Sequence, residues 1–476
     1  MNYKHQIVLT PRDVLYFRDG RPIGGAADGN GAQWPLPTVW HSAVLSAFHR
    51  NFSEEDVGKY AKKHEHARTK PGNNTYKDKN FGSREKARTK AVFGGVKTLG
   101  PFPRMKDKDG KDEIYFPLPA DLLPEEKNDP KNPSPAQLLP CKPKLGGASN
   151  LPPPLKYVLW KEIKPTKQDL GQWISQKGLE LYLEGKIEEL KKYIKNNGKD
   201  NLGHIRVNSD FFETEARPGI AINPETGTAE DSKFYSAEYL RLKTDVNMCA
   251  FIDADSVGKG NEHHDLWDEF CRNTLRQSLI FGGQRGVVWS RPPKAKEILI
   301  PEAKKHFSQI SDGDKDKFLL KWTLLSPAFF NAGWIPGFCT ERKNEEIIKD
   351  GKVRLKAIPV RGTLTRDEWR KKCTNAPKIN AQLVAARIGK AITVSGWKIN
   401  ATEKDGNDGA GAPKATRLLV PAGSVYYFEC DSAEDAEKLY VALHGKVKSD
   451  LLGEQGYGLG VCSAWEFGED FKQQKQ

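Results

Sequence analysis

The sequence of 476 residues has no run of about 18 apolar residues, so no segment is predicted to cross a membrane as a helix. Its first residues also lack the apolar stretch of a secretory signal, and we therefore expect a cytoplasmic protein. The seven cysteines are scattered along the chain and never spaced as CxxC. This pattern predicts reduced thiols and no zinc site.

Motifs of several enzyme classes are also missing. No P-loop of the form GxxxxGK[ST] lies near the glycine-rich end of the chain, and there is no zincin motif, Cys/His nucleophile signature or polymerase-like Gly-Gly-Asp-Asp run. Nucleotide hydrolysis is therefore unsupported. We expect no cofactor, no catalytic residue and no metal.

Positive charge is in excess and unevenly spread. The chain holds 75 Lys and Arg against 62 Asp and Glu, a formal net charge of +13, which predicts an acidic partner, first nucleic acid and second an anionic membrane. Residues 57–106 alone hold 14 Lys and Arg against three acids. Two interpretations of this stretch stay open: a solvated insertion without its own core, or a basic arm that becomes ordered on phosphate.

The length predicts two or three domains, and the pattern of elements restarts near residue 245. We therefore predict one domain over 1–245 and a second over 246–476. In the first domain, residues 38–52 predict an amphipathic helix with Thr38 as its N-cap. Trp40, Val44 and Phe48 form its apolar stripe.

Three stretches in the middle of the chain have distinct patterns. Proline punctuates residues 107–165, which predicts loop in place of long helices. Residues 179–198 predict one exposed helix, because the sequence there is mostly polar. Residues 204–243 alternate short β-like runs with turn signals, which predicts a hairpin.

The end of the chain combines a strand, a helix capped by Ser432, a glycine-rich loop and a closing strand. This order is typical of the second half of a split βαβ unit, with the loop GEQGYGLG before the last strand. Glycine at four of eight positions suits either of two roles. The loop is a tight turn, or its main-chain amides form a nest for a phosphate.

Eight motifs occur along the chain in a specific order. They are LTPRDVLYFRDGRPIG, WPLPTVWHSAVLSAF, ARPGIAINPETGTAEDSKFYSAEYLRL, IFGGQRGVVW, LLSPAFFNAGWIPG, AITVSGWKI, KATRLLVPAGSVYYFE and EQGYGLGV. Together they resemble the third subunit of the Cmr complex, the type III-B CRISPR effector's member of the RAMP superfamily that is related to the Cas-five group. The resemblance runs from Leu9 to Val461, except for insertions at about 53–91 and 104–200.

The resemblance implies an α+β fold of two ferredoxin-like (RRM-like) RAMP domains with large insertions and the C-terminal glycine-rich loop. It also implies a non-catalytic, structural role. The subunit would hold the 5′ tag of the CRISPR RNA and bridge the large Cas-ten subunit to the first backbone subunit. Target RNA would be recognised indirectly, through pairing with the guide, and no membrane is involved.

The same resemblance suggests which residues line the groove for the tag. Arginine suits phosphate because its fork bonds two oxygens at once, and an exposed tyrosine can stack on an unpaired base. For each arginine the alternative is a salt bridge, with Asp13 or Asp19 for the first two, and for the histidine it is a solvated helix position. The candidates are Arg18, Arg21, His41, Arg285, Gly456, Tyr457, Gly458 and Gly460.

Other functions remain as alternatives. A RAMP endoribonuclease would process precursor CRISPR RNA without a metal, with His41 as general base. A third hypothesis is a scaffold whose basic arm binds an acidic subunit. A metal cluster is a weak alternative for His263 and His264 beside Asp253, Asp255 and Asp265. The preferred interpretation is a polar loop in which Asp265 caps a helix.

Overall fold

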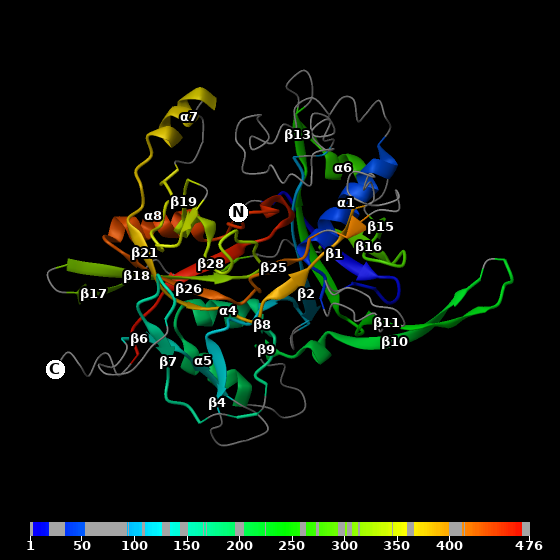
Figure 1. Ribbon diagram of the computed structural model, residues 1–476, viewed down its shortest axis with the longest axis horizontal. Helices are drawn as coiled ribbons and strands as arrows, with labels where there is room; N and C mark the ends of the chain where they lie inside the picture. The colour runs from blue at the N-terminus through cyan, green and yellow to red at the C-terminus, as the bar shows by residue number, and fades with distance from the viewer. Residues whose placement is uncertain are drawn as a thin grey trace. The chain divides into compact units, whose positions relative to one another are not determined.

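The computed structural model (Figure 1) describes part of the chain in detail. The described residues are 3–18, 34–52, 93, 95–106, 110–125, 134–142, 151–164, 166–167, 169–195, 204–223, 225–257, 263–272, 276–293, 300–301, 307–312, 315–344, 346–358, 366–398, 412–413 and 415–468. None of the described helices is long and apolar enough to cross a membrane. None of the seven cysteines forms a disulfide bond.

The chain forms two compact units that are discontinuous in sequence. The first unit holds Met1–Met105, Phe211–Glu297 and Glu454–Gly456. The second holds Lys106–Asp210, Ile298–Gly453 and Tyr457–Gln476. The units therefore differ from the predicted division at residue 245, because the segment 106–210 packs with the C-terminal half of the chain.

The first unit is built on an antiparallel sheet in the order β15–β16–β1–β12–β2. Its strands β1 and β12 have buried residues at successive positions, which suits strands that are covered on both faces. Val8 and Leu9 of β1, for example, are fully buried. The strands are β1 (His5–Pro11), β2 (Lys97–Lys106), β12 (Asn247–Asp253), β15 (Gln277–Ile280) and β16 (Val287–Arg291).

Helix α1 (Pro37–Asn51) packs against this sheet. The predicted stripe of Trp40, Val44 and Phe48 is confirmed, because each side chain has no exposed surface. The Trp40 indole donates a hydrogen bond to the Phe251 carbonyl oxygen at 3.0 Å. The prediction of Thr38 as N-cap is wrong: the helix already begins at Pro37, whose missing N–H makes it well suited to the first helical position.

The predicted hairpin over 204–243 is confirmed as a long two-stranded ribbon of β10 (Phe212–Ile222) and β11 (Ala229–Leu242) (Figure 1). Its base is tied to the segment after β1 by ion pairs. Asp13 accepts from Arg241 at 3.0 Å and lies 3.5 Å from Arg217. Asp13, a predicted partner of the first arginines in the chain, is therefore already engaged by the ribbon.

The second unit has its own antiparallel sheet, in the order β21–β26–β18–β28–β27, with β17 also pairing with β18. Helix α8 (Ala433–Leu443) is capped by Ser432, whose hydroxyl accepts from the Asp435 amide, as predicted. The strands are β17 (Ser308–Asp312), β18 (Lys315–Leu324), β21 (Ala381–Arg387), β26 (Val425–Cys430), β27 (Lys446–Val447) and β28 (Leu459–Ala464).

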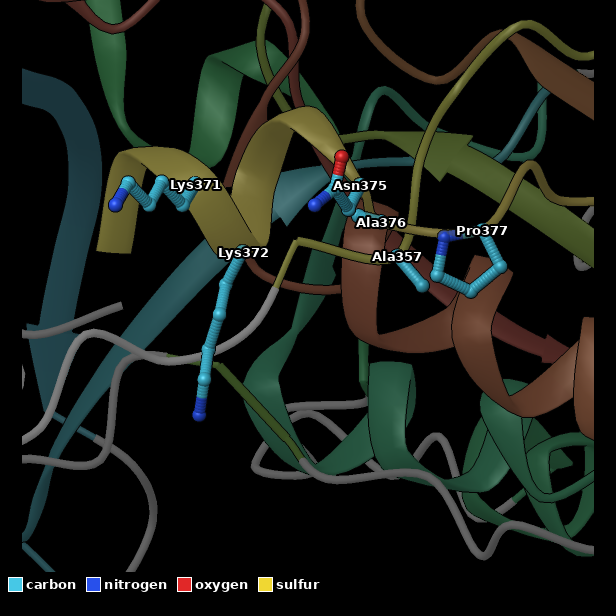
Figure 2. A pocket seen from close by; sticks show the side chains of 6 residues that line it. All are labelled: Ala357, Lys371, Lys372, Asn375, Ala376 and Pro377. Carbon is cyan, nitrogen blue, oxygen red and sulfur yellow. The ribbon is translucent and has the colours of Figure 1, made fainter. Parts of the chain in front are cut away.

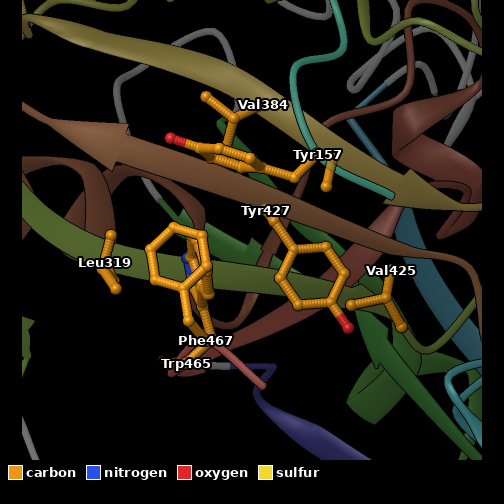
Figure 3. Packing of buried hydrophobic residues seen from close by; sticks show 8 residues of the cluster. Tyr157, Leu319, Val384, Val425, Tyr427, Trp465 and Phe467 are labelled. Carbon is orange, nitrogen blue, oxygen red and sulfur yellow. The ribbon is translucent and has the colours of Figure 1, made fainter. Parts of the chain in front are cut away.

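Aromatic side chains fill the core beside this sheet (Figure 3). Tyr427 of β26 packs edge-on against Trp465, with 5.6 Å between ring centroids. Tyr157, from the predicted proline-rich insertion, packs edge-on against Phe467 at 4.9 Å. The insertion therefore contributes to the core of the second unit.

The segment 106–210 corrects two predictions. The proline-rich part is not a loop throughout but contains short strands: β3 (Asp112–Pro117), β4 (Leu122–Glu125), β5 (Ser134–Gln137), β6 (Leu139–Cys141) and β7 (Val158–Trp160). Two more short strands follow it in this segment, β8 (Trp173–Ser175) and β9 (Ile205–Arg206). The single exposed helix is wrong as well. Gly185, with φ +73°, separates α4 (Gln176–Leu183) from α5 (Ile187–Lys195), and Leu179 and Tyr182 of α4 are fully buried.

A buried polar network explains why this segment belongs to the second unit. The carboxylate of Asp121, itself fully buried, accepts hydrogen bonds from Tyr182 at 2.8 Å and from Tyr427 and Gln137 at 2.9 Å each. Lys321 of β18 lies 3.8 Å from the same carboxylate. Donors from the insertion and from the C-terminal sheet thus meet on one carboxylate, and a buried charge is tolerated only with such partners.

Short pieces complete the second unit. They are helix α7 (Arg366–Thr374) and the strands β19 (Glu341–Lys343), β20 (Glu346–Ile348), β22 (Ile392–Val394), β23 (Trp397–Lys398), β24 (Ala412–Pro413) and β25 (Arg417–Leu419). The first unit also contains α6 (Leu266–Phe270) with β13 (Asp255–Val257) and β14 (His263–Asp265).

Candidate RNA-binding surface

The loop FGGQRG, residues 281–286, joins β15 to β16 and carries Arg285. The Gly286 amide donates to the Gly283 carbonyl oxygen at 3.1 Å, so residues 283–286 form a tight turn. Gln284 and Arg285, the two central residues, have φ of +53° and +54°. Positive φ at both central positions is the pattern of a type I′ turn, which strongly prefers asparagine and glycine.

The backbone of this turn is strained, and the turn lies on the surface of the protein. A residue with a Cβ loses about 1–2 kcal/mol in the left-handed region, and here two adjacent residues occupy it. Gln284 and Arg285 are both exposed, so packing of their side chains does not explain the choice. Strained backbone at an exposed tip is typical of sites that present side chains to a ligand.

The glycines of the loop have a structural role. The Gly283 amide donates to the Tyr16 carbonyl oxygen at 2.8 Å. A Cβ on Gly282, where φ is +79°, would lie 2.6 Å from the Tyr16 carbonyl oxygen. These two glycines therefore let the loop lie directly on the segment that follows β1.

That segment carries Arg18. Tyr16 pairs with Gly283 as an antiparallel bridge, and Phe17 packs edge-on against Phe281 at 5.8 Å. The structure thus brings the stretch with Arg18 beside the loop with Arg285, and both arginines are exposed. Within the described residues neither has an ion-pair partner. Arg21 lies outside the described residues, as does the basic stretch 53–92.

Two further polar residues on this surface were not predicted from the sequence. Arg12 is exposed on the same segment, and its amide donates to the Val287 carbonyl oxygen at 2.9 Å. Gln284 is the neighbour of Arg285 at the turn. Arg12 lies in the motif LTPRDVLYF and was available as a signal, whereas nothing local indicates that Gln284 is held outward.

His41 does not lie on an open surface. Its side chain is buried, with 7 % of the residue exposed, and Nδ1 lies 3.1 Å from the Thr98 hydroxyl on β2. The predicted placement of His41 in a groove for RNA is therefore corrected: it packs between α1 and the sheet. The helix turns this position toward β2 although it lies outside the Trp40 stripe.

The glycine-rich end is also corrected, from an exposed nest to a packed turn. Residues 456–460 are all buried. The Gly458 amide donates to the Pro327 carbonyl oxygen at 2.8 Å and the Leu459 amide to the Ser326 hydroxyl at 2.8 Å, so both already have partners. Of the two roles left open by the sequence, the structure supports the tight turn.

Each glycine of this turn is required by close packing. Gly456 has φ +91°, and a Cβ there would lie 2.7 Å from the Thr98 carbonyl oxygen. Gly458 has φ +78° and faces the Ser449 backbone, while a Cβ on Gly460 would clash with the Trp322 indole. The glycines therefore allow main chain and side chains to approach, and no phosphate is needed to explain them.

Tyr457 is not available as a stacking platform. Only 2 % of the residue is exposed, and its ring packs on Phe329 with 5.2 Å between centroids. A base can stack only on an accessible ring face, so the predicted role of Tyr457 is wrong. A glycine-rich flank had suggested an open loop, but burial of the ring depends on contacts distant in sequence.

The acidic and histidine side chains around α6 form ion pairs. Asp265 caps α6 through hydrogen bonds from the Trp267 and Asp268 amides, as predicted. Its other oxygen lies 2.6 Å from Lys4 Nζ and 2.7 Å from His5 Nε2. Partial burial alone would raise the pKa of Asp265, but hydrogen bonds from His5 and Lys4 lower it well below its ordinary value. The Lys4 ammonium thus already supplies a cation to this carboxylate.

Comparison with known families decides the class of protein. The profile of the CRISPR-associated protein (Cas_Cmr3) family matches residues 7–465, nearly the whole chain. The chain belongs to the Cas_Cmr3 family. Membership in this CRISPR-associated family supports a subunit of a type III-B effector complex. No curated protein sequence gives a significant match.

Solved structures with a similar chain were also found. Two are cryo-EM structures of the type III-B Cmr-beta complex. In the one bound to cognate target RNA and AMPPnP, the matching chain is 14% identical, the match covers 89% of this chain and 86% of that chain, and the TM-score is 0.37. In the one bound to cognate target RNA, the identity is 13%, the match covers 95% of each chain, and the TM-score is 0.40. A third is the crystal structure of a Csm3–Csm4 subcomplex of the type III-A interference complex (12%, 89% and 92%, 0.33). The assignment of this Cas_Cmr3 chain depends on the family profile.

Proposed function

We propose that this Cas_Cmr3 chain is a non-catalytic structural subunit of a type III-B Cmr effector, which binds the 5′ tag of the CRISPR RNA and bridges the Cas-ten subunit to the backbone. Family membership and a net charge of +13 support a place in a ribonucleoprotein. The tag would lie against the surface formed by residues 12–18 and the 281–286 loop.

The observation that carries the proposal is the turn at Gln284 and Arg285. Two adjacent exposed residues keep a left-handed backbone, and Arg285 has no carboxylate partner within the described residues. Arg18 lies on the adjoining segment, also without a carboxylate partner. Two exposed arginines on adjoining segments suit consecutive phosphates of a short RNA strand.

We also propose that both units are ferredoxin-like. In the first, the strands lie in the order β16–β1–β12–β2, with α1 between β1 and β2 in the chain and α6 between β12 and β16. In the second, the corresponding order is β28–β18–β26–β21, with α8 between β26 and β28. Numbered along the chain, both orders are fourth, first, third, second, as expected for a βαββαβ unit.

The test is binding of a fluorescein-labelled tag RNA by anisotropy over a series of salt concentrations. The double charge swap Arg18→Glu with Arg285→Glu is expected to weaken binding about tenfold or more. Loss of two phosphate contacts would reduce the slope of log affinity against log salt by about 1.4 for a single strand. The matched control, Arg50→Glu with Arg272→Glu, makes the same charge change at exposed arginines of the first unit and should bind more tightly than the test variant.

Two results would overturn the proposal. Equal affinity and slope for the test and control variants would remove Arg18 and Arg285 from the surface. In an assembled complex, crosslinks from the first tag nucleotides only to other subunits would exclude tag binding by this chain. Incubation with labelled repeat RNA tests the endoribonuclease alternative: we expect no products, and discrete products lost in His41→Ala would show an enzyme.

A further inference from the structure

A second basic surface lies on the other compact unit, around the end of α7. An open hollow of about 370 Å³ is lined by Ala357, Lys371, Lys372, Asn375, Ala376 and Pro377. Figure 2 shows Ala357, Ala376 and Pro377 close together beside the helix end, with the side chains of Lys371 and Lys372 extending away from the helix. We call this the α7 hollow.

More lysines surround the hollow than its architecture requires. Lys356 and Lys378 are directly paired across two antiparallel segments, where like charges are destabilising. Lys356 Nζ donates to the Thr374 carbonyl oxygen at 2.7 Å. A helix C-terminus favours cations, which accounts for Lys371 or Lys372 and for Lys356, whose ammonium bonds this last carbonyl of α7, but not for Lys378 opposite Lys356.

The neighbouring acids do not neutralise this charge. Arg354 holds both oxygens of Asp350 at 2.8 Å and also pairs with Glu341 at 3.2 Å. Within the part of the chain that the structure describes, Lys356, Lys371, Lys372 and Lys378 have no carboxylate within ion-pair distance. Lysines therefore outnumber acids around the hollow, where Glu368 of α7 is one turn from Lys371 and Lys372, and this excess of positive charge fits an anion.

We propose that the α7 hollow binds the sugar–phosphate backbone of single-stranded RNA, with one nucleotide seated in the hollow. The lysine ammonium groups would contact phosphates, which are recognised without regard to sequence. Ala357, Ala376 and Pro377 form an apolar floor for a ribose or base, and the Asn375 amide can both donate and accept. The volume lies at the small end of the range for ligand pockets, about 300–1,000 Å³.

The mixed lining favours RNA over an acidic peptide. A carboxylate-rich chain would need charge alone, whereas the lining of the hollow includes apolar residues as well as the two lysines. This site goes beyond the proposed function, because it lies in the second unit and is independent of the tag surface. The two proposals can therefore fail separately.

The test uses the full chain and a labelled uridine 12-mer that lacks any tag sequence. We expect Lys371→Glu with Lys372→Glu to weaken anisotropy-measured affinity at least fivefold and to lower the salt slope by about 1.4, for two lost phosphate contacts. The control, Lys167→Glu with Lys390→Glu, carries the same charge change at two exposed lysines of the second unit outside the hollow. It should reduce affinity by less than twofold.

A second variant guards against unfolding of α7, since acids in the last turn oppose the helix dipole. Lys371→Gln with Lys372→Gln keeps good helix formers and should still lose at least threefold in affinity. The proposal is overturned if both lysine variants bind like the control. It is also overturned if the wild-type chain binds a labelled poly-glutamate peptide through these lysines more tightly than the 12-mer, which would assign the hollow to an acidic protein segment.

Discussion

Lys321 carries a positive charge into the interior of the second unit, and its titration tests the buried network around Asp121. Burial lowers the pKa of Lys321 to about 8, from an ordinary value of 10.5, against the opposing effect of Asp121. Between about pH 8 and pH 10.5, Lys321 is mostly protonated in the unfolded chain and mostly deprotonated in the folded protein. The contribution of Lys321 to stability therefore rises with pH across this window, by at most about 1.4 kcal/mol per pH unit.

The test substitution is Lys321→Met, which keeps an unbranched side chain against the ring of Tyr182. In the wild type, Lys321 Nζ lies 3.8 Å from the centroid of this ring. From about pH 7 to about pH 9.5, the wild type should gain about 2 kcal/mol in free energy of unfolding relative to the variant. The range ends there because burial raises the pKa of Tyr182 and Tyr427, so both would oppose folding at higher pH.

The assay is urea unfolding at closely spaced pH values, with the difference between wild type and Lys321→Met plotted against pH. Lys390→Met is the control, because this lysine of the same unit is exposed to water and its difference from wild type should stay flat. A difference for Lys321→Met that also stays flat, within about 0.5 kcal/mol, would show that the interior position does not hold a desolvated ammonium.

Two further predictions concern local structure. Gly458→Ala should lower the free energy of unfolding, measured by thermal unfolding, by at least about 2 kcal/mol, because φ is +78° and the new Cβ meets the Ser449 backbone. The control is Gly453→Ala, whose Cβ would meet only the Val447 side chain at 3.7 Å and which should cost less than half as much. Equal costs for the two variants would contradict the packed turn. Ser432→Ala should cost about 1 kcal/mol by removing the cap of α8, with Ser432→Asp near wild type; an unchanged melting temperature in the alanine variant would contradict the cap.

Local patterns predicted several elements correctly. The spacing of Trp40, Val44 and Phe48 indicated the buried face of α1, and Ser432 marked the start of α8. Turn signals indicated the β10–β11 hairpin. These predictions succeed because periodicity and capping depend on residues a few positions apart. Helix length was less predictable: Gly185 ends α4, and the burial of Tyr182 depends on Asp121, which lies 61 positions earlier.

The candidate surface was predictable only in part. Arg18 and Arg285 were named from the sequence, and the structure brings their segments together through Tyr16 and Gly283. His41 and Tyr457 were misplaced because a lone polar or aromatic side chain does not reveal which face the tertiary structure covers. Glycines near position 458 indicated close approach, but not whether a ligand or the protein's own backbone approaches.

By itself, the sequence determined the family, the excess of positive charge and the elements whose pattern is local. Only the tertiary structure decided that residues 106–210 pack with the C-terminal half, that the glycine-rich end is buried, and that Arg285 stands on a strained turn. The physical reason is that burial and compensation of charge depend on partners distant in sequence. Asp121 meets Tyr427 across 306 positions, and no local pattern records such a pairing.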